Sequence, residues 1–401
     1  MDELHSIIER LAASPAGQAC ALATLVHVDG SSYRGVGARA LALPDGDTIG
    51  LISGGCLEGD LLERAGEVLA DGRARTVRYD STAPEDALLG LGLGCNGVVD
   101  VLLERVQTAD AVPAGRYLPL LEQARRGGRR SALATVYRST EGGEVGARLA
   151  LVEEPPATDA PPPAPRLHHF GHLRGALREA LSRDLSALLD GGRSHSATYQ
   201  VERAPVQALL ELVEPPLALT VCGAGPDAEP LVTLAANLGW APVVFDHRAA
   251  FARPERFPGA SRVVTGAREG FAAAVPPRAG EVAVLMTHSY PTDLAYLEQL
   301  APRHLRYIGV LGPRRRLERL LEELGARAPA TVTLYGPAGL DIGADTPAEI
   351  ALSIVAEIQA VLAGRGGAPL RERPEPIHSA TCTADHGGSG TGGGEVSAAG
   401  S

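Results

Sequence analysis

Lysine is absent from this chain of 401 residues, so all 37 of its basic residues are arginine. The absence excludes mechanisms that need a lysine amine, such as Schiff-base formation, the lysine of a phosphate-binding loop and the kinase lysine. Cysteine is also scarce. The five cysteines are an odd number at scattered spacing, which is not the pattern of a secreted disulfide framework.

Long apolar runs and an excess of positive charge are missing as well. No segment reaches the ~20 apolar residues that span a bilayer, and the first residues, MDELH, lack the features of a signal peptide. The net charge of −11 argues against a nucleic-acid partner. We therefore expect a cytoplasmic protein without membrane or nucleic-acid contacts.

Short apolar segments alternate with helical patterns and predict an α/β fold. A proline pair at 215–216 separates an N-terminal mixed α/β domain, 1–214, from a Rossmann-like parallel-sheet domain, 215–366. Within the first domain, the residues from 153 to 166 are rich in proline and acids and are expected to form a surface loop. The last segment, 367–401, is expected to be a disordered tail.

The N-terminal domain also contains a weak internal repeat. The string ALATV at 132–136 echoes ALATL at 21–25, and the apolar segment 206–213 echoes 98–106. These echoes predict that residues 18–106 and 130–214 are two halves of one α/β unit.

A dinucleotide-like turn lies at the start of the second domain. The sequence GAGPDA, 223–228, matches G-x-G-x-x-A between a predicted strand and a predicted helix. Gly223 and Gly225 would let a phosphate approach the helix N-terminus, and Asp246 ends the next strand, where a ribose-binding acid belongs. NAD(P) is one predicted ligand, and a Rossmann fold without nucleotide is the alternative. His288 follows a later strand as a candidate acid/base group or a hydrogen-bonded loop residue.

Two cysteines lie in glycine-rich turns. Cys56 follows Ser53, Gly54 and Gly55 at a predicted helix N-terminus, where the helix dipole favours a thiolate. Cys95 lies between Gly94 and Gly97, which allow close approach of a ligand to the backbone. Thiolates and free N–H groups suit an anionic, thiophilic ligand, and burial of each cysteine in a tight turn is the alternative. A zinc site is disfavoured because no C-x-x-C pair occurs.

Several motifs in order resemble one known family, the XdhC/CoxI proteins, over about residues 15–365. The N-terminal motifs are GSSYRGVGAR at 30–39, ISGGCLE at 52–58 and GLGCNG at 92–97. The C-terminal motifs are MTHSYP at 286–291, YIGVLG at 307–312 and GLDIGADTP at 339–347. Pro226 departs from the family, which often has histidine after the Rossmann Gly-x-Gly, and Asn96 departs from its Gly-Gly.

The resemblance implies an accessory protein that binds molybdenum cofactor, supports its sulfuration and inserts it into an apo molybdenum hydroxylase of the xanthine dehydrogenase or CO dehydrogenase type. It favours a non-catalytic chaperone over an enzyme. A sulfurtransferase of the cysteine desulfurase type is the second implied partner, and a homodimer is compatible with it. The cofactor would be molybdopterin, or its dinucleotide form.

Under this resemblance, the expected molybdenum contacts are the Cys56 and Cys95 thiolates, because thiolates are soft ligands. The expected contacts for the phosphate end are Arg34, Arg39, Ser53, Gly54 and Gly55, with Gly94 and Gly97 beside Cys95. A different class of function, a NAD(P)-dependent oxidoreductase with His288 as its acid/base group, is the alternative. A cofactor-modifying nucleotidyl- or sulfur-transfer enzyme is a third.

Overall fold

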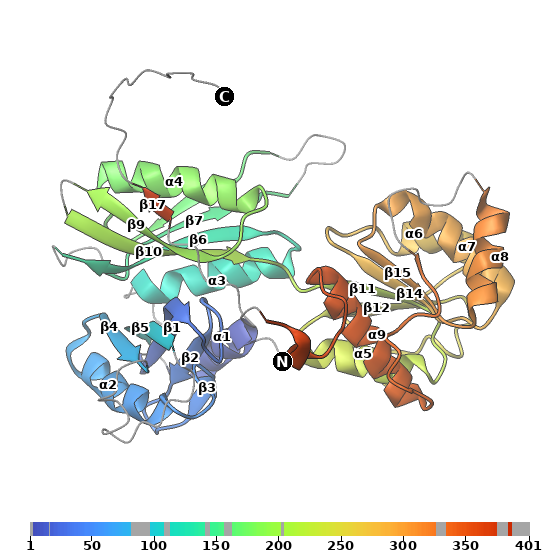
Figure 1. Ribbon diagram of the computed structural model, residues 1–401, viewed down its shortest axis with the longest axis horizontal. Coiled ribbons are helices and arrows are strands. Elements are labelled where there is room, and N and C mark those ends of the chain that lie inside the picture. Colours follow the sequence, from blue (N-terminus) through green and yellow to red (C-terminus); the bar gives the residue numbers. More distant parts are fainter. Residues whose placement is uncertain are drawn as a thin grey trace, which may run out of the picture. The chain divides into compact units, whose positions relative to one another are not determined.

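The computed structural model describes residues 3–15, 17–81, 97–107, 113–140, 145–155, 163–201, 204–325, 334–374 and 384–386. They form two compact units (Figure 1). The N-terminal unit comprises Glu3–Glu214 and a short strand near the end of the chain, and the C-terminal unit comprises Pro215–Pro374. Across these described ranges, none of the helices combines the length and apolar character needed to cross a bilayer.

The first half of the N-terminal unit is a five-stranded antiparallel sheet in the order β3-β2-β1-β5-β4, covered by helices. Helix α2 packs on it through Leu61, Ala65 and Val68, which share one face of the helix. The elements are α1 (Glu3–Ala13), β1 (Ala19–Gly30), β2 (Arg39–Ala42), β3 (Thr48–Gly50), α2 (Glu58–Asp71), β4 (Arg75–Asp80) and β5 (Gly97–Gln107).

The second half is a six-stranded sheet in the order β17-β9-β10-β6-β7-β8, in which only β17 runs parallel to its neighbour. Strand β17 lies within the segment that the sequence predicts as a disordered tail. The elements are α3 (Pro113–Arg126), β6 (Ser131–Ser139), β7 (Arg148–Val152), β8 (Arg166–Phe170), α4 (Gly175–Leu189), β9 (His195–Val201), β10 (Ala204–Val213) and β17 (Ala384–His386).

The two halves share one connectivity, which confirms the predicted internal repeat. In each half the first strand lies between the second and the fifth, and a helix separates the third strand from the fourth. Both first strands have a bulge at the same place, at Val26 in β1 and Tyr137 in β6. Ser196 Oγ of the second half donates to the Val26 carbonyl over 2.7 Å, and Thr76 Oγ1 of the first half donates to the Tyr137 carbonyl.

Buried ion pairs join the halves reciprocally. Arg39 on β2 donates to Glu211 on β10 over 2.8 and 2.5 Å. Arg148 on β7 donates to Glu104 on β5, with one contact of 3.0 Å. None of the four side chains is more than 10% exposed. Because each charge is neutralised by a residue of the other half, neither half could bury its arginine alone at low cost.

The C-terminal unit is a six-stranded parallel sheet in the order β13-β12-β11-β14-β15-β16. This is the 3-2-1-4-5-6 order of a Rossmann fold, so the predicted fold class is confirmed. Its elements are β11 (Ala218–Cys222), α5 (Ala228–Asn237), β12 (Ala241–Asp246), β13 (Arg262–Thr265), α6 (Phe271–Ala274), β14 (Val282–Leu285), α7 (Tyr290–Leu300), β15 (Tyr307–Val310), α8 (Arg314–Leu324), β16 (Leu334–Tyr335) and α9 (Pro347–Leu362).

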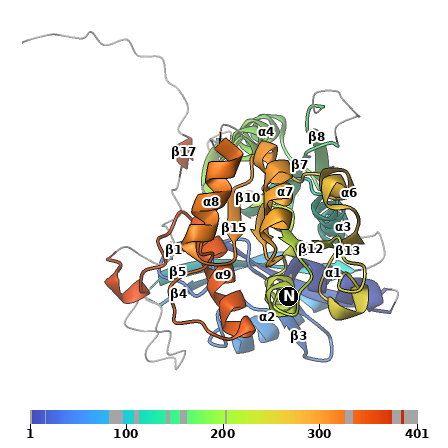
Figure 2. The same ribbon diagram turned by 90° about the vertical axis from the view of Figure 1, so that its right-hand side faces the viewer.

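Helices cover both faces of this parallel sheet, as its continuously apolar strands require. Helices α5 and α9 pack on one face, and α6, α7 and α8 pack on the other, with α7 and α8 side by side (Figure 2). The sequence TPAE at 346–349 is typical of a capping box at the start of a helix, and the structure contains it, because Thr346 and Glu349 cap each other's backbone N–H groups. Because the strands of this sheet run parallel, their carboxyl ends share one edge of the sheet, where ligands of this fold bind.

We predict that Arg148→Met lowers the free energy of unfolding by about 3–5 kcal/mol, because it leaves Glu104 buried without its partner. The double substitution of Arg148 and Glu104 by methionine should recover most of this loss. Denaturant unfolding of the full chain measures both. Arg314→Met, which removes an exposed pair with Glu318, is the control and should change stability by about 0.5 kcal/mol or less. Equal effects at Arg148 and Arg314 would contradict the prediction.

Candidate functional site

A pocket of about 440 Å³, counting its open mouth, lies in the first half of the N-terminal unit. It is bounded by β1, β4 and β5, by the segment after β1 and by the segment that leads into α2. Three of the predicted site residues, Ser53, Cys56 and Gly97, line it. The full lining is Leu25, Ser31, Ser32, Tyr33, Ile52, Ser53, Cys56, Leu57, Tyr79, Ser81, Gly97 and Val99.

Cys56 presents an exposed thiol at this pocket, whereas the other cysteines that the structure describes, Cys20 and Cys222, are buried. The turn before it uses two left-handed glycines, Gly54 with φ 80° and Gly55 with φ 112°. A Cβ on Gly54 would lie 3.3 Å from the ring of Tyr33, so a larger residue here would require the ring to shift by a few tenths of an ångström. Tyr33 itself is 58% exposed. The thiol and an aromatic ring thus border the same opening.

The N–H groups of this turn bind the chain's own Glu58. Its Oε1 accepts from the Ser53 N–H over 2.9 Å and the Ile52 N–H over 3.2 Å. Its Oε2 accepts from Ser53 Oγ over 2.5 Å, the Gly55 N–H over 2.9 Å and the Leu57 N–H over 3.2 Å. Burial raises the pKa of the Glu58 carboxyl, but these hydrogen bonds outweigh burial and hold the pKa below its ordinary value. The donors that the sequence offered to a phosphate therefore already bind a carboxylate.

Gly97 closes the pocket on the side of β5. A Cβ at this position would lie 2.2 Å from the Ser31 carbonyl oxygen, so no other residue fits without a shift of the backbone. Its N–H donates to Ser81 Oγ over 2.8 Å, and its carbonyl accepts from the same hydroxyl over 2.7 Å. The predicted contacts Cys95 and Gly94 lie outside the described residues.

The two predicted arginine contacts have other partners. Arg34 pairs with Glu3 over 3.1 Å and donates to the Leu51 carbonyl over 3.3 Å. Arg39 is the buried partner of Glu211. Neither lines the pocket. The structure gives Arg39 a role in joining the halves, because its guanidinium is held within the protein rather than at the opening.

Sequence reasoning assigned no role to Glu58, Tyr33 or Tyr79. Glu58 had a usable signal, because an acid that begins a helix directly after a glycine turn can accept hydrogen bonds from the turn. Tyr79 lines the pocket but donates its hydroxyl to Asp60 over 2.5 Å, and burial raises the pKa of this hydroxyl. Its pairing could not be read from spacing along the chain.

At the edge of the Rossmann sheet, Gly223 forms the predicted tight turn with φ 119°. A Cβ here would lie 2.7 Å from the Met286 carbonyl oxygen, so the close packing of the turn requires glycine. Asp246 is buried beneath the turn and accepts from the Ala224 N–H over 2.8 Å. Arg248 binds the same carboxylate through its backbone N–H and its guanidinium, at 2.7 to 3.0 Å.

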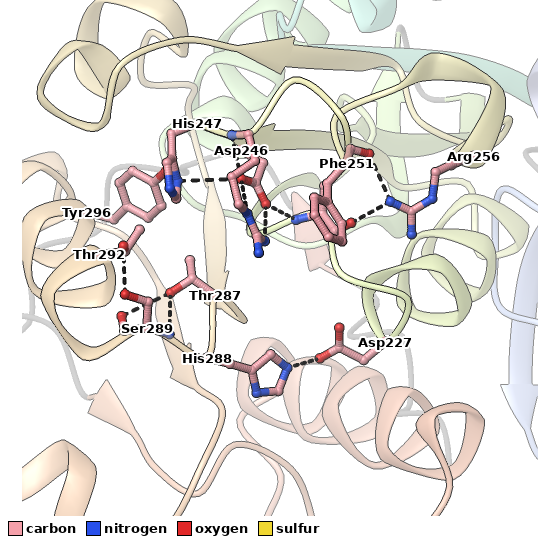
Figure 3. A network of polar contacts seen from close by, with 12 residues as sticks. Asp227, Asp246, His247, Phe251, Arg256, Thr287, His288, Ser289, Thr292 and Tyr296 are labelled. Atoms are coloured by element: carbon pink, nitrogen blue, oxygen red, sulfur yellow. Dashed lines mark hydrogen bonds and ion pairs between the residues drawn. The ribbon is translucent and has the colours of Figure 1, made fainter.

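His288 and Asp227 face each other across this edge (Figure 3). Nε2 of His288 lies 2.8 Å from Oδ2 of Asp227. His288 has a positive φ of 55° and a side chain that is 67% exposed. The structure thus brings Gly223, Gly225, Asp246 and His288 to one edge, as predicted from their strand ends, with Asp227 among them.

Among the residues that the structure describes, metal ligands do not converge at either place. Within the described ranges, no group of three or more His, Cys, Asp and Glu side chains could hold a metal ion. Cys56 is a single exposed sulfur, which suits contact with a metal that brings its own ligands better than a complete protein metal site.

Comparisons with known proteins match both units. The family model described as the XdhC Rossmann domain matches residues 219–358, and the model of the XdhC and CoxI family matches residues 13–80. A protein of Bacillus subtilis (strain 168), named as a probable subunit of xanthine dehydrogenase, is 31% identical over 358 residues, which are 89% of this chain and 97% of that protein. The "Molybdenum cofactor insertion chaperone PaoD" of Escherichia coli (strain K12) is 32% identical over 112 residues, which are 27% of this chain and 34% of that protein.

A solved structure agrees with these matches. The crystal structure of a xanthine dehydrogenase from Bacillus halodurans superposes with a TM-score of 0.73 at 31% identity and covers 91% of this chain and 97% of that one. With the resemblance of the motifs and the match over nearly the whole length, the chain belongs to the XdhC/CoxI family.

Proposed function

We propose that this chain binds molybdenum cofactor as a cargo and delivers it to an apo molybdenum hydroxylase of the xanthine dehydrogenase type. The names of two relatives support the proposal, since one refers to xanthine dehydrogenase and the other to a molybdenum cofactor insertion chaperone. The observation that carries it is the exposed Cys56 thiol at the mouth of a pocket.

The pocket offers different groups to the molybdenum and to the pterin of such a cargo. A thiolate is a soft ligand that can contact molybdenum, and the exposed ring of Tyr33 offers a face on which a flat pterin ring can stack. Hydroxyls of Ser31, Ser32 and Ser81 border the same opening. The backbone N–H groups of Ser53 and Gly55 are bound to Glu58, so we propose that the turn serves the cargo mainly by presenting the thiol.

The finer steps belong to the same proposal. The cargo would receive sulfur from a cysteine desulfurase while it is bound here, and this chain would act without catalysing a reaction of its own. Cys95, with Gly94, remains a predicted second contact, and Gly97, two residues further on, borders the pocket. Whether the cargo is molybdopterin alone or its dinucleotide form would be decided at its phosphate end.

We predict that Cys56→Ala lowers the amount of cofactor that co-purifies with the protein by about tenfold or more, because the molybdenum loses its thiolate contact. The full chain is purified from cells that make the cofactor and denatured, and the oxidised pterin in the supernatant is measured by fluorescence. Cys222→Ala, which removes a buried thiol of the other unit, is the matched control and should retain pterin. Equal pterin in Cys56→Ala and the unmodified protein would remove Cys56 from the site, and no pterin in either would refute the proposed function.

We also predict that Glu58→Gln destabilises the turn that carries Cys56, lowering the free energy of unfolding by about 1–2 kcal/mol near neutral pH. The folded-state pKa of Glu58 lies below its ordinary value of 4.5, so its contribution is complete above pH 4.5 and is lost as the pH falls through the folded-state pKa. The difference between the unmodified and substituted proteins should therefore shrink below pH 4.5 in urea unfolding.

Glu63→Gln is the control for this experiment, because Glu63 is an exposed acid on the same helix. It should leave stability and its pH dependence nearly unchanged. A Glu58→Gln difference that stays constant as the pH falls would contradict the role given to the Glu58 carboxylate.

A further inference from the structure

The C-terminal unit has the fold of a dinucleotide-binding domain, but its phosphate-binding turn contains a carboxylate of the chain itself. In such folds the pyrophosphate lies over the glycine turn, at the N-terminus of the helix that follows. Here Oδ1 of Asp227 lies against that turn, only 2.4 Å from the place that a Cβ on Gly225 would take. Asp227 is the residue directly before α5, so its carboxylate is at the positive end of the helix.

Asp227 is held in this place. Its Oδ2 receives a hydrogen bond of 2.8 Å from Nε2 of His288, which lies after β14, the strand next to β11 in the sheet (Figure 3). Its Oδ1 is buried and has no hydrogen-bond partner within the described structure. A buried, unpaired carboxylate oxygen is unfavourable, so its position depends on the His288 contact and on the packing of the turn.

A phosphate at this turn would meet a negative charge at contact distance. The two groups would repel each other in a partly buried site, where charge interactions are poorly screened. Pro226 also removes one of the N–H groups that such a turn would offer. The turn keeps the glycines that a dinucleotide needs, but the negative charge of Asp227 disfavours a phosphate there.

The ribose end of the site is also occupied. A carboxylate can accept about four hydrogen bonds, and Asp246 already accepts four, from the Ala224 N–H and from three donors of Arg248. The guanidinium of Arg248 stacks on Phe251, with 4.2 Å between its central carbon and the ring centroid, which holds it in place. The Asp246 carboxylate is therefore not available to a ribose diol without rearrangement.

We propose that Asp227, positioned by His288, determines the specificity of the C-terminal unit by excluding a diphosphate from the glycine turn. The unit therefore selects against NAD(P) and accepts only ligands that place no phosphate there. This selectivity is a property of the Rossmann edge alone and does not depend on molybdenum cofactor binding by the N-terminal unit.

The test is a titration of the full chain with NADH, followed by the fluorescence of the nicotinamide. Asp227→Asn keeps the shape of the side chain and removes its charge, and Asp227→Gly opens the turn completely. We expect each variant to bind NADH about tenfold or more tightly than the unmodified protein. Inorganic pyrophosphate, added as a competitor, should displace NADH from the variants if binding is at the phosphate turn.

Glu322→Gln is the matched control, because it removes one negative charge from an exposed position on α8. It should bind NADH as weakly as the unmodified protein. A gain confined to Asp227→Gly would still support exclusion by Asp227, through its volume. The proposal is overturned if folded Asp227→Asn and Asp227→Gly both bind NADH no more tightly than the unmodified protein, with folding checked by thermal unfolding.

Discussion

The reciprocal pairing of Arg39 with Glu211 and Arg148 with Glu104 is the constraint on which the N-terminal unit depends. A buried guanidinium is tolerated only with a well-placed carboxylate, and each half supplies the carboxylate for the other. The left-handed glycines Gly37 and Gly146 allow this, since a Cβ on either would lie 2.8 Å from the glutamate of the pair. The two sheets are thereby joined by buried ion pairs, and the first of them carries the pocket.

Both units also share a way of using glycine-rich turns. In the first, the turn N–H groups bind the carboxylate of Glu58, the first residue of α2. In the second, the carboxylate of Asp227, directly before α5, lies against the turn without a hydrogen bond to it. An internal carboxylate keeps the N–H groups or the helix dipole satisfied without ligand. In the N-terminal unit this leaves the Cys56 thiol as the reactive group that faces outward, so the chemistry of the pocket depends on sulfur and aromatic surface more than on phosphate binding.

The parts of this structure that the sequence predicts are those set by local pattern. Alternating apolar strands and helices predict the Rossmann sheet, and Thr346 with Glu349 predicts the start of the last helix. The partner of Arg39 could not be predicted, because Glu211 is distant in sequence and the motif around Arg39 equally suits a phosphate loop. Glycine turns likewise predict free N–H groups, whereas in the structure the Glu58 carboxylate accepts hydrogen bonds from them.

Comparison of the two halves of the internal repeat distinguishes the contacts that the fold requires from the segment that forms the site. The ion pairs, the bulges and the hydroxyl contacts to the bulged residues occur in both halves. The segment between the third strand and the following helix differs between the halves. In the first half it comprises residues 51–57, which contain the glycine turn and Cys56, and in the second half it is the shorter segment 171–174, which has no cysteine. Since this segment makes none of the reciprocal contacts, it could diverge without loss of the contacts common to both halves. A symmetric scaffold can thus carry one thiol-bearing pocket in only one of its halves.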